Sequence, residues 1–270
     1  MSEPAQEGAK EGERIAKRLA RAGLCSRRDA ERWIADGRVK VDGKILETPA
    51  FVVTDKSQIE VDGKPLPAAD RVRVWRYHKP PGEMVTARDP EGRKTIFDSL
   101  PKGMPRVVTI GRLDFMSEGL LLLTNDGGLS RTLELPANGW TRRYRARVHG
   151  AVDEAKLAAL QGGIIIEGVR YGAIQASLDR QQRSNAWLDI ALAEGKNREV
   201  RRVLAHLELP VVRLIRVAFG PFHLGELERG HVDEIPPQAL DNLLGLKPPP
   251  RKKGWAKPKP RDDRHKKRRH

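Results

Sequence analysis

The stretch Ile110-Gly111-Arg112-Leu113-Asp114-Phe115-Met116-Ser117-Glu118-Gly119-Leu120-Leu121-Leu122-Leu123-Thr124 decides the fold, because it joins two apolar segments through a short polar loop. Residues 107–110 predict one buried strand and residues 120–124 predict another. A loop between two core strands holds its side chains firmly, which suits a catalytic carboxylate. The plainer interpretation is a structural pair, in which Arg112 and Asp114 simply hold the loop together.

The chain from residue 71 to residue 246 is typical of a single mixed domain around this stretch. Its patterns predict strands at 72–77, 107–110, 120–124, 143–149, 164–167, 187–192 and 211–217. They predict helices at 128–134, 153–160, 197–207 and 236–244. Strands outnumber helices and do not alternate with them regularly. The fold class expected is therefore α+β, with a mixed, mainly antiparallel sheet rather than a doubly wound one.

A smaller α/β unit is predicted at residues 13–64, before a proline-rich linker at 65–70. Ser26 stands three residues before Asp29 and predicts a capping box at the start of its second helix. Asp42-Gly43 and Asp62-Gly63 each predict a hairpin turn. The polar residues 1–12 and the basic residues 247–270 are expected to be a disordered leader and a disordered tail.

The charge of the chain is strongly positive but unevenly distributed. The net charge is +15, and residues 247–270 hold twelve Lys or Arg against two Asp. The tail therefore carries ten of the fifteen excess charges. A surplus of this size favours a polyanionic partner, and in the rest of the chain a basic surface must come from clustering.

The cellular location expected is the cytoplasm. A single cysteine, Cys25, excludes an internal disulfide, which suits a reducing compartment, and we expect this residue to serve packing or to be incidental. The first residues lack the apolar region of a signal peptide. No apolar run approaches the roughly 20 residues of a membrane span.

Two clusters of cations are candidate contacts for phosphate groups. Arg28 and Arg32 stand four apart on one face of the second predicted helix, opposite an apolar face. A second cluster opens the helix predicted at 197–207, where backbone N–H groups also favour anions. An ordinary solvated helix face is the alternative in both places. The residues that are candidates for these phosphate contacts are Arg27, Arg28, Arg32, Lys40, Lys196, Asn197, Arg198 and Arg202, and the family resemblances given next imply that the phosphates are those of RNA.

Residues 13–60 resemble the S4 RNA-binding domain. The resemblance is carried by Ser26-Arg27-Arg28 and by Gly37-Arg38-Val39-Lys40-Val41-Asp42-Gly43. It implies a structured RNA as the target but says nothing about chemistry. Such domains occur on synthetases, methyltransferases, ribosomal proteins and pseudouridine synthases.

Gly111-Arg112-Leu113-Asp114, continued by residues 117–127, resembles the signature loop of the RsuA/RluB-type pseudouridine synthases. The resemblance implies that Asp114 is the nucleophile and that Arg112 helps to extrude and replace the flipped uridine. It implies that Arg201 pairs with Asp114 and that Tyr144 stacks on the target base. Lys79, in the proline-rich turn 77–82, is expected to shape the site and to contact RNA.

The resemblance is closest to the RluB branch, which modifies large-subunit (23S) ribosomal RNA. It implies an isomerisation that needs no cofactor and no metal. The sequence agrees, since it has no dinucleotide fingerprint and no Walker A motif, and one Cys with seven scattered His does not make a zinc deaminase site. A monomer is expected. The competing hypothesis is a non-catalytic ribosome-assembly factor that uses the S4-like unit and the tail to bind RNA.

The basic tail generates a first prediction. Removing residues 247–270 deletes twelve cations, so RNA affinity is expected to depend less steeply on salt, by several units of log–log slope. Binding titrations at several salt concentrations, with the full chain and with a chain ending at Leu246, measure both slopes. Equal slopes would show that the tail does not contact RNA.

Overall fold

The computed structural model describes residues 12–245, so the predicted leader and basic tail lie outside the described residues. The S4-like unit begins with β1 (Glu13–Arg14), α1 (Ile15–Arg21) and α2 (Arg27–Ala35). Its other strands are β2 (Val39–Val41), β3 (Lys44–Ile45), β4 (Val52–Val53), β5 (Ile59–Val61) and β6 (Lys64–Pro65). Four of them form a sheet in the order β3-β2-β5-β6, while β1 pairs with β4.

Local sequence signals account for the start of α2 and for both hairpins of this unit. The Ser26 side chain accepts from the Asp29 N–H at 3.0 Å, and the Asp29 carboxylate accepts from the Ser26 N–H at 3.1 Å, which confirms the capping box. Asp42-Gly43 and Asp62-Gly63 have positive φ at both residues, the geometry of a type I′ turn. The two predicted hairpin turns are therefore confirmed.

The unit has its own hydrophobic core. Ile15, Leu19, Ala30 and Val39 have no exposed surface, and Cys25 is buried among them. Arg38 pairs with Asp62 through two hydrogen bonds of 2.9 and 2.6 Å and lies 4.7 Å above the Trp33 ring. These contacts occupy the Arg38 guanidinium, whereas the cations of α2 remain at the surface.

The second part of the chain is built on one large sheet. Its strands follow the order β13-β14-β10-β15-β9-β7-β17, with β8 added to β9 and β16 added to β15. All pairs are antiparallel except β9 with β15. The predicted α+β class with a mixed, mainly antiparallel sheet is confirmed. The strands are β7 (Val74–Lys79), β8 (Val108–Ile110), β9 (Ser117–Thr124), β10 (Arg142–His149), β13 (Ile174–Gln182), β14 (Asn185–Leu192), β15 (Val211–Phe219), β16 (Phe222–His223) and β17 (Val232–Glu234), with β11 (Ile164–Ile166) and β12 (Val169–Tyr171) forming a separate hairpin.

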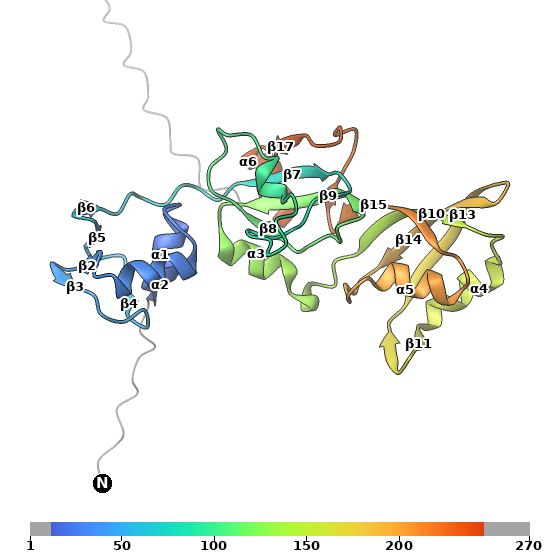
Figure 1. Cartoon of the computed structure of the whole chain (residues 1–270), viewed down its shortest axis with the longest axis horizontal. Coiled ribbons are helices and arrows are strands. Elements are labelled where there is room, and N and C mark those ends of the chain that lie inside the picture. Colours follow the sequence, from blue (N-terminus) through green and yellow to red (C-terminus); the bar gives the residue numbers. More distant parts are fainter. Residues whose placement is uncertain (1–11, 246–270) are drawn as a thin grey trace, which may run out of the picture. The chain divides into compact units, whose positions relative to one another are not determined.

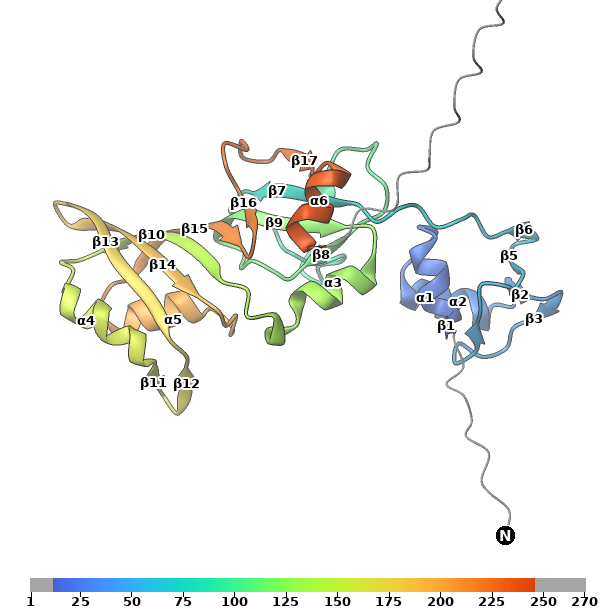
Figure 2. The ribbon, with the colours of Figure 1, turned by 180° about the vertical axis from the view of Figure 1, so that it is seen from behind.

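The predicted helices are present, with shifts of one or two residues at most ends. They are α3 (Gly127–Glu134), α4 (Glu154–Ala159), α5 (Glu199–His206) and α6 (Pro237–Leu244), with short 3-10 turns at Ile96–Asp98, Pro136–Asn138 and Leu160–Gly162. Helices α4 and α5 cover the same side of strands β10, β13 and β14, as two opposite views show (Figures 1 and 2). Helix α6 begins with a proline in its first turn and ends at Gly245 in the left-handed region.

Strand β9 lies at the centre of the sheet, and all eight of its residues are buried. It pairs with β7 along one edge, while its other edge is shared by β15 near Ser117 and by β8 near Thr124. Gly119 lies where β15 comes closest. A Cβ built on Gly119 would lie 2.3 Å from the Arg216 carbonyl oxygen and 2.7 Å from its nitrogen. Only glycine lets the two backbones approach this closely.

We predict that Gly119→Ala destabilises the protein more than an ordinary glycine substitution. Both Gly119 (φ +103°) and Gly92 (φ +70°) have positive φ, but a Cβ on Gly92 would meet no atom within 4 Å. Gly92→Ala therefore reports the backbone cost alone. Steric overlap with Arg216 is expected to cost Gly119→Ala about 1 to 3 kcal/mol more. Urea denaturation of both variants measures this difference, and equal free energies of unfolding would contradict the steric argument.

Candidate active site

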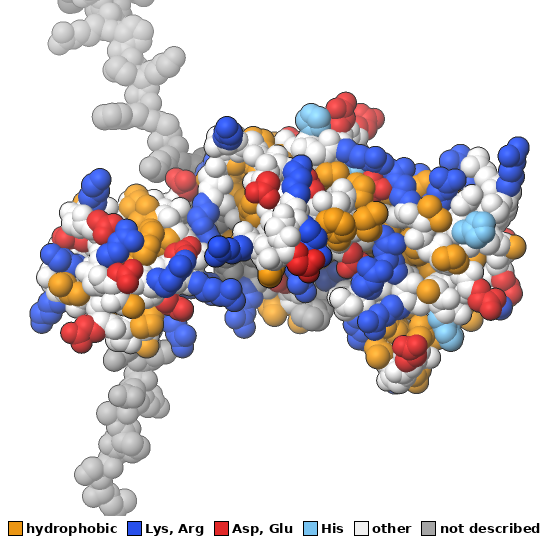
Figure 3. Space-filling model, viewed as in Figure 1, with side chains coloured by type: hydrophobic (Ala, Val, Ile, Leu, Met, Phe, Trp, Pro, Cys, Tyr) orange, Lys and Arg blue, Asp and Glu red, His pale blue; other side chains and the backbone are white. Residues whose placement is uncertain are grey.

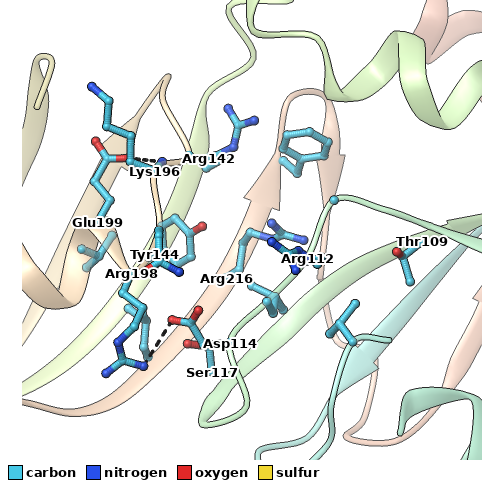
Figure 4. Close-up of a pocket in the computed structure, with 18 of the residues that line it drawn as sticks. Thr109, Arg112, Asp114, Ser117, Arg142, Tyr144, Lys196, Arg198, Glu199 and Arg216 are labelled. Carbon is cyan, nitrogen blue, oxygen red and sulfur yellow. Dashed lines mark hydrogen bonds and ion pairs between the residues drawn. The ribbon is translucent and has the colours of Figure 1, made fainter. Parts of the chain in front are cut away.

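The loop between β8 and β9 opens into a pocket of about 710 Å³ that gathers residues from distant parts of the sequence. Arg112 and Asp114 come from this loop, Tyr144 from β10 and Arg198 from the residue before α5. Figure 4 shows these side chains around one common space. Asp114 and Arg201 are the predicted catalytic residues that lie farthest apart in the sequence, more than 80 residues from each other, and the fold brings them together.

Two guanidinium groups lie beside the Asp114 carboxylate. Oδ2 of Asp114 is 3.8 Å from Nη1 of Arg198 and 4.0 Å from Nε of Arg201. Arg201 is the more enclosed, because only 13% of its side chain is exposed, against 50% for Arg198. Burial and the neighbouring Arg198 lower the pKa of Arg201, and the Asp114 charge opposes this. The carboxylate therefore has a fixed cation on one side and a more accessible one on another.

The backbone of the Asp114 loop is held by donors from two other segments, the turn 77–82 and helix α5. The Lys79 ammonium donates to the carbonyls of Phe115 (3.2 Å) and Ser117 (2.9 Å). The Gly82 N–H also donates to the Phe115 carbonyl, at 2.9 Å. Arg201 donates to the Met116 carbonyl at 3.1 Å. A loop with successive carbonyls fixed in this way presents its carboxylate in a preformed position.

Lys79 is enclosed by the protein. Its side chain has no exposed surface, and its ammonium makes a third hydrogen bond, of 2.9 Å, to the Pro80 carbonyl. Burial lowers the pKa of Lys79 to about 8, although Glu83, Asp114 and Glu118 oppose that shift. The direct RNA contact predicted for Lys79 is not supported by the structure, because backbone carbonyls surround its charge. Its predicted role in shaping the site agrees with these contacts.

Tyr144 lies on the pocket side of β10, next to an irregularity in the sheet. A register shift separates Arg143 from Tyr144 in the pairing with β15, and β-bulges of this kind often re-aim side chains at active sites. Tyr144 then stands directly opposite Arg216 on β15 and Ile190 on β14. Its half-buried ring packs against both hydrophobic cores of this sheet.

Arg216 lines the pocket but had been given no role from the sequence. Along β15, Leu214, Arg216 and Ala218 alternate on the buried side, so a signal was present: a charged residue at a core position of a strand. The sequence alone does not show whether such a residue meets a partner or opens into a cavity.

The residues just before α5, together with Arg202 in its first turn, form an exposed cationic rim. Lys196, Asn197, Arg198 and Arg202 are all exposed. The Lys196 ammonium is engaged with Glu194 (2.7 Å) and with the Arg170 carbonyl (2.6 Å). Blue Lys and Arg side chains gather around α5 in the space-filling view (Figure 3). Contact of this rim with RNA remains a prediction.

Helix α5 begins at Glu199 rather than at the predicted residue 197. Arg198, its N-cap, adopts the left-handed conformation (φ 50°, ψ 31°), which interrupts helical geometry. The Glu199 side chain accepts from the Lys196 N–H at 2.8 Å, and burial raises the pKa of this carboxyl. A left-handed arginine is uncommon outside turns, and here it lies beside the candidate nucleophile.

The cations predicted to bind RNA in the S4-like unit are placed at its surface. Arg27, Arg28 and Arg32 are exposed on α2, and Lys40 on β2 is half-buried. Arg32 pairs with Asp29, which also caps the helix. Their contact with RNA also remains a prediction.

Two other features are absent from residues 12–245, the part of the chain that the structure describes. No cluster of three or more His, Cys, Asp or Glu side chains in this range is arranged to hold a metal ion. None of the helices described there has the length and apolar character needed to cross a membrane.

A carboxylate with flanking arginines and a tyrosine, in a pocket with a cationic rim, is an arrangement suited to an enzyme that acts on a polyanion. Comparison with known proteins makes this class specific. The family model described as RNA pseudouridylate synthase matches residues 73–206, and the S4 domain model matches residues 13–59. A Rickettsia felis protein described as an RNA pseudouridine synthase is 44% identical over 229 residues, which cover 85% of this chain and 99% of that protein. The chain belongs to the RNA pseudouridine synthase family.

Other relatives agree with this assignment. The ribosomal large subunit pseudouridine synthase B of Yersinia pestis is 41% identical, over 87% of this chain and 76% of its own length. The protein of the same description from Pseudomonas aeruginosa is 42% identical, over 88% and 64%. A crystal structure of a pseudouridylate synthase aligns with a TM-score of 0.59 and 25% identity, covering 85% of this chain and 99% of that one.

The environment of Lys79 predicts how its substitution acts. Lys79→Met leaves the loop carbonyls without their buried donor, at a cost of about 1 to 3 kcal/mol for an unsatisfied group. We expect a lower melting temperature and a slower reaction at saturating RNA, with little change in RNA affinity. Thermal melting, single-turnover rates and binding titrations measure the three quantities.

Lys102→Met is the matched control, because Lys102 is an exposed lysine on the same part of the chain. It is expected to leave melting temperature and rate unchanged. If Lys79→Met instead weakened RNA binding without slowing the reaction of bound RNA, the sequence-based assignment of Lys79 to RNA contact would be restored.

Proposed function

We propose that this protein converts a specific uridine of large-subunit (23S) ribosomal RNA into pseudouridine, without a cofactor and with Asp114 as the nucleophile. The observation that carries the proposal is the placement of Asp114. Its loop is held by Lys79 and Arg201, and its carboxylate opens into a pocket beside Tyr144. The relatives named for the large ribosomal subunit support the choice of substrate.

The proposed reaction breaks the C1′–N1 bond, turns the uracil and rejoins it through C5. A stacked base is shielded from reaction, so the uridine first leaves its helix and enters the pocket. Arg112 is exposed at the pocket, beside the nucleophile, and we assign to it the replacement of the extruded base. Tyr144 stacks on the uracil and assists removal of the C5 proton.

Asp114 supplies the covalent chemistry. A carboxylate nucleophile divides one difficult step into two easier ones. It adds to C1′ or to C6, or it promotes a glycal intermediate, and the proposal covers all three routes. Arg201 keeps the carboxylate in position on each route. Its Nε lies 4.0 Å from Oδ2 of Asp114, and it donates a hydrogen bond to the Met116 carbonyl of the same loop.

The cationic rim at the start of α5 and the exposed face of α2 are proposed to bind the RNA backbone. Both surfaces carry arginines whose guanidinium groups match phosphate geometry. Because sequence is read only through bases, these contacts would position the RNA rather than select the uridine. We propose a monomer acting in the cytoplasm, where ribosomal RNA is available.

The experiment that tests this function is pseudouridine mapping of ribosomal RNA from cells that lack the gene. We expect one large-subunit site to lose its modification, and we expect the wild-type gene to restore it. Asp114→Asn keeps the size of the side chain but removes the nucleophile, so it should restore nothing. Asp36→Asn, which alters an exposed acid in the S4-like unit, is the matched control and should restore the site.

Two outcomes would contradict the proposed reaction, and a third would change only the physiological role assigned to the protein. If no site is lost, the chain does not modify ribosomal RNA under these conditions. If Asp114→Asn restores both the modification and growth, Asp114 is not the nucleophile. If it restores growth but not the modification, the physiological role is that of an RNA-binding assembly factor.

A further inference from the structure

Arg216 is a buried cation that the reaction described above does not use. It lies on β15 with 3% of its surface exposed, and it lines the same pocket as Asp114 and Tyr144. Nε donates to the Leu120 carbonyl at 2.8 Å. Among the residues that the structure describes, Nη2 has no hydrogen-bond partner. A buried guanidinium with an unused donor is costly, because its hydration is lost and only partly replaced.

The surroundings of Arg216 hold its guanidinium in place. Its Cζ lies 5.4 Å from the centre of the Phe219 ring, which favours a cation above its face. Tyr144 stands opposite Arg216 across the β10–β15 pair. Burial lowers the pKa of Arg216, and the interaction with Tyr144 opposes this shift. Its backbone is fixed against Gly119 by close contact. Figure 4 shows Arg216, Tyr144 and Asp114 pointing into the same space.

The position of Nη2 of Arg216 in the pocket indicates which part of a bound nucleotide it can reach. The exposed Arg198 and Arg202 are available to phosphates at the rim of the pocket, whereas Arg216 is enclosed beside Tyr144. The part of a nucleotide that enters most deeply is the base. Uracil presents two acceptors, the carbonyl oxygens O2 and O4, and its charge changes during the reaction.

We propose that Nη2 of Arg216 donates a hydrogen bond to a carbonyl oxygen of the target uracil and stabilises the negative charge that the ring acquires during the reaction. This inference rests on the function proposed above. It assigns Arg216 as a further catalytic residue that contacts the reacting base, in addition to the Asp114, Arg201 and Tyr144 set.

The charge arises on every route considered. When the C1′–N1 bond breaks, its electron pair stays on N1 and spreads to O2 and O4. C1′ receives a replacement pair from an Asp114 oxygen, or from the C2′–H bond as that proton leaves. If Asp114 adds to C6 instead, the electron pair of the C5–C6 bond moves towards O4. C5 then bonds to C1′ as the Asp114–C1′ bond breaks, or as the C2′ proton returns to the glycal. An adduct at C6 likewise releases Asp114 as the C5–C6 double bond is restored. C5 finally loses its proton and N1 gains one, so the atoms balance without any other reactant.

Preorganised donors act most strongly where charge develops in an enclosed site. Removal of one such donor typically slows the chemical step by ~10²- to 10³-fold. Arg216→Met keeps a long apolar chain but has no donor. We expect it to slow the single-turnover conversion of deletion-strain ribosomal RNA by about that factor. RNA affinity should change by less than about threefold, because the phosphate contacts at the rim remain.

Arg216→Lys provides a readout that a structural role would not change. It keeps one positive charge, but an ammonium buried at this position should have a lowered pKa, whereas arginine stays charged. The lysine is active when protonated, so the rate of this variant should fall as pH rises through that lowered pKa. The wild-type rate, measured over the same pH range, should not show this additional fall.

Arg147→Met is the matched control, because Arg147 is an exposed arginine on the same strand as Tyr144. It should react at the wild-type rate. Thermal melting verifies that each variant is folded, and if Arg216→Met is not, Arg216→Lys and Arg216→Gln are compared in its place. Two results together would overturn the assignment. They are a rate for Arg216→Gln equal to that of Arg216→Lys at low pH, and a rate for Arg216→Lys that does not fall as pH rises.

The outcomes separate the two proposals. If the wild-type protein does not convert the RNA, the function proposed above fails. If wild type converts it and a folded Arg216→Met does so equally fast at saturating RNA, only the role of Arg216 fails. A defect that appears in RNA affinity and disappears at saturation would also overturn that role, since it would make Arg216 a binding residue alone.

Discussion

The active site depends on the close approach of two backbones, at Gly119 of β9 and Arg216 of β15. This is the parallel pair in an otherwise antiparallel sheet. It brings the loop that precedes β9 beside the strand that faces Tyr144 and beside the start of α5. A side chain at Gly119 would overlap the Arg216 backbone, so the absence of a Cβ at this one position lets the Asp114 loop lie close to the groups around it.

Charge and hydrogen bonding in the pocket serve different purposes. Lys79 and Arg201 donate hydrogen bonds to backbone carbonyls of the Asp114 loop and so fix its shape. The Arg198 guanidinium lies beside the Asp114 carboxylate, but half of its side chain is exposed to solvent. Arg216 is enclosed and keeps one donor unused. Cations that look alike in a sequence thus differ in function according to how far each is removed from water.

Much of this arrangement could be predicted from the sequence. Capping and turn signals at Ser26, Asp42 and Asp62 act over a few residues, so they predicted local structure correctly. Strand β13 was missed although Ile174, Ala176 and Leu178 alternate at its start, because its second half is polar and lies at the sheet edge. Burial was harder to predict. A lysine in a proline-rich turn gives no sign of whether its charge meets RNA or three carbonyl groups, since this depends on contacts distant in sequence.

The contacts that hold the Asp114 loop have a consequence for synthesis of the chain. Lys79 reaches carbonyls 36 and 38 residues away, and Arg201 reaches one 85 residues away. The buried residues of the S4-like core, by contrast, all lie between residues 15 and 61. Domains fold as units and from the N-terminus during translation. The S4-like unit can therefore form early, while the Asp114 loop lacks part of its framework until α5 has been made. An unfinished chain would thus present a folded S4-like unit before it has a complete active site.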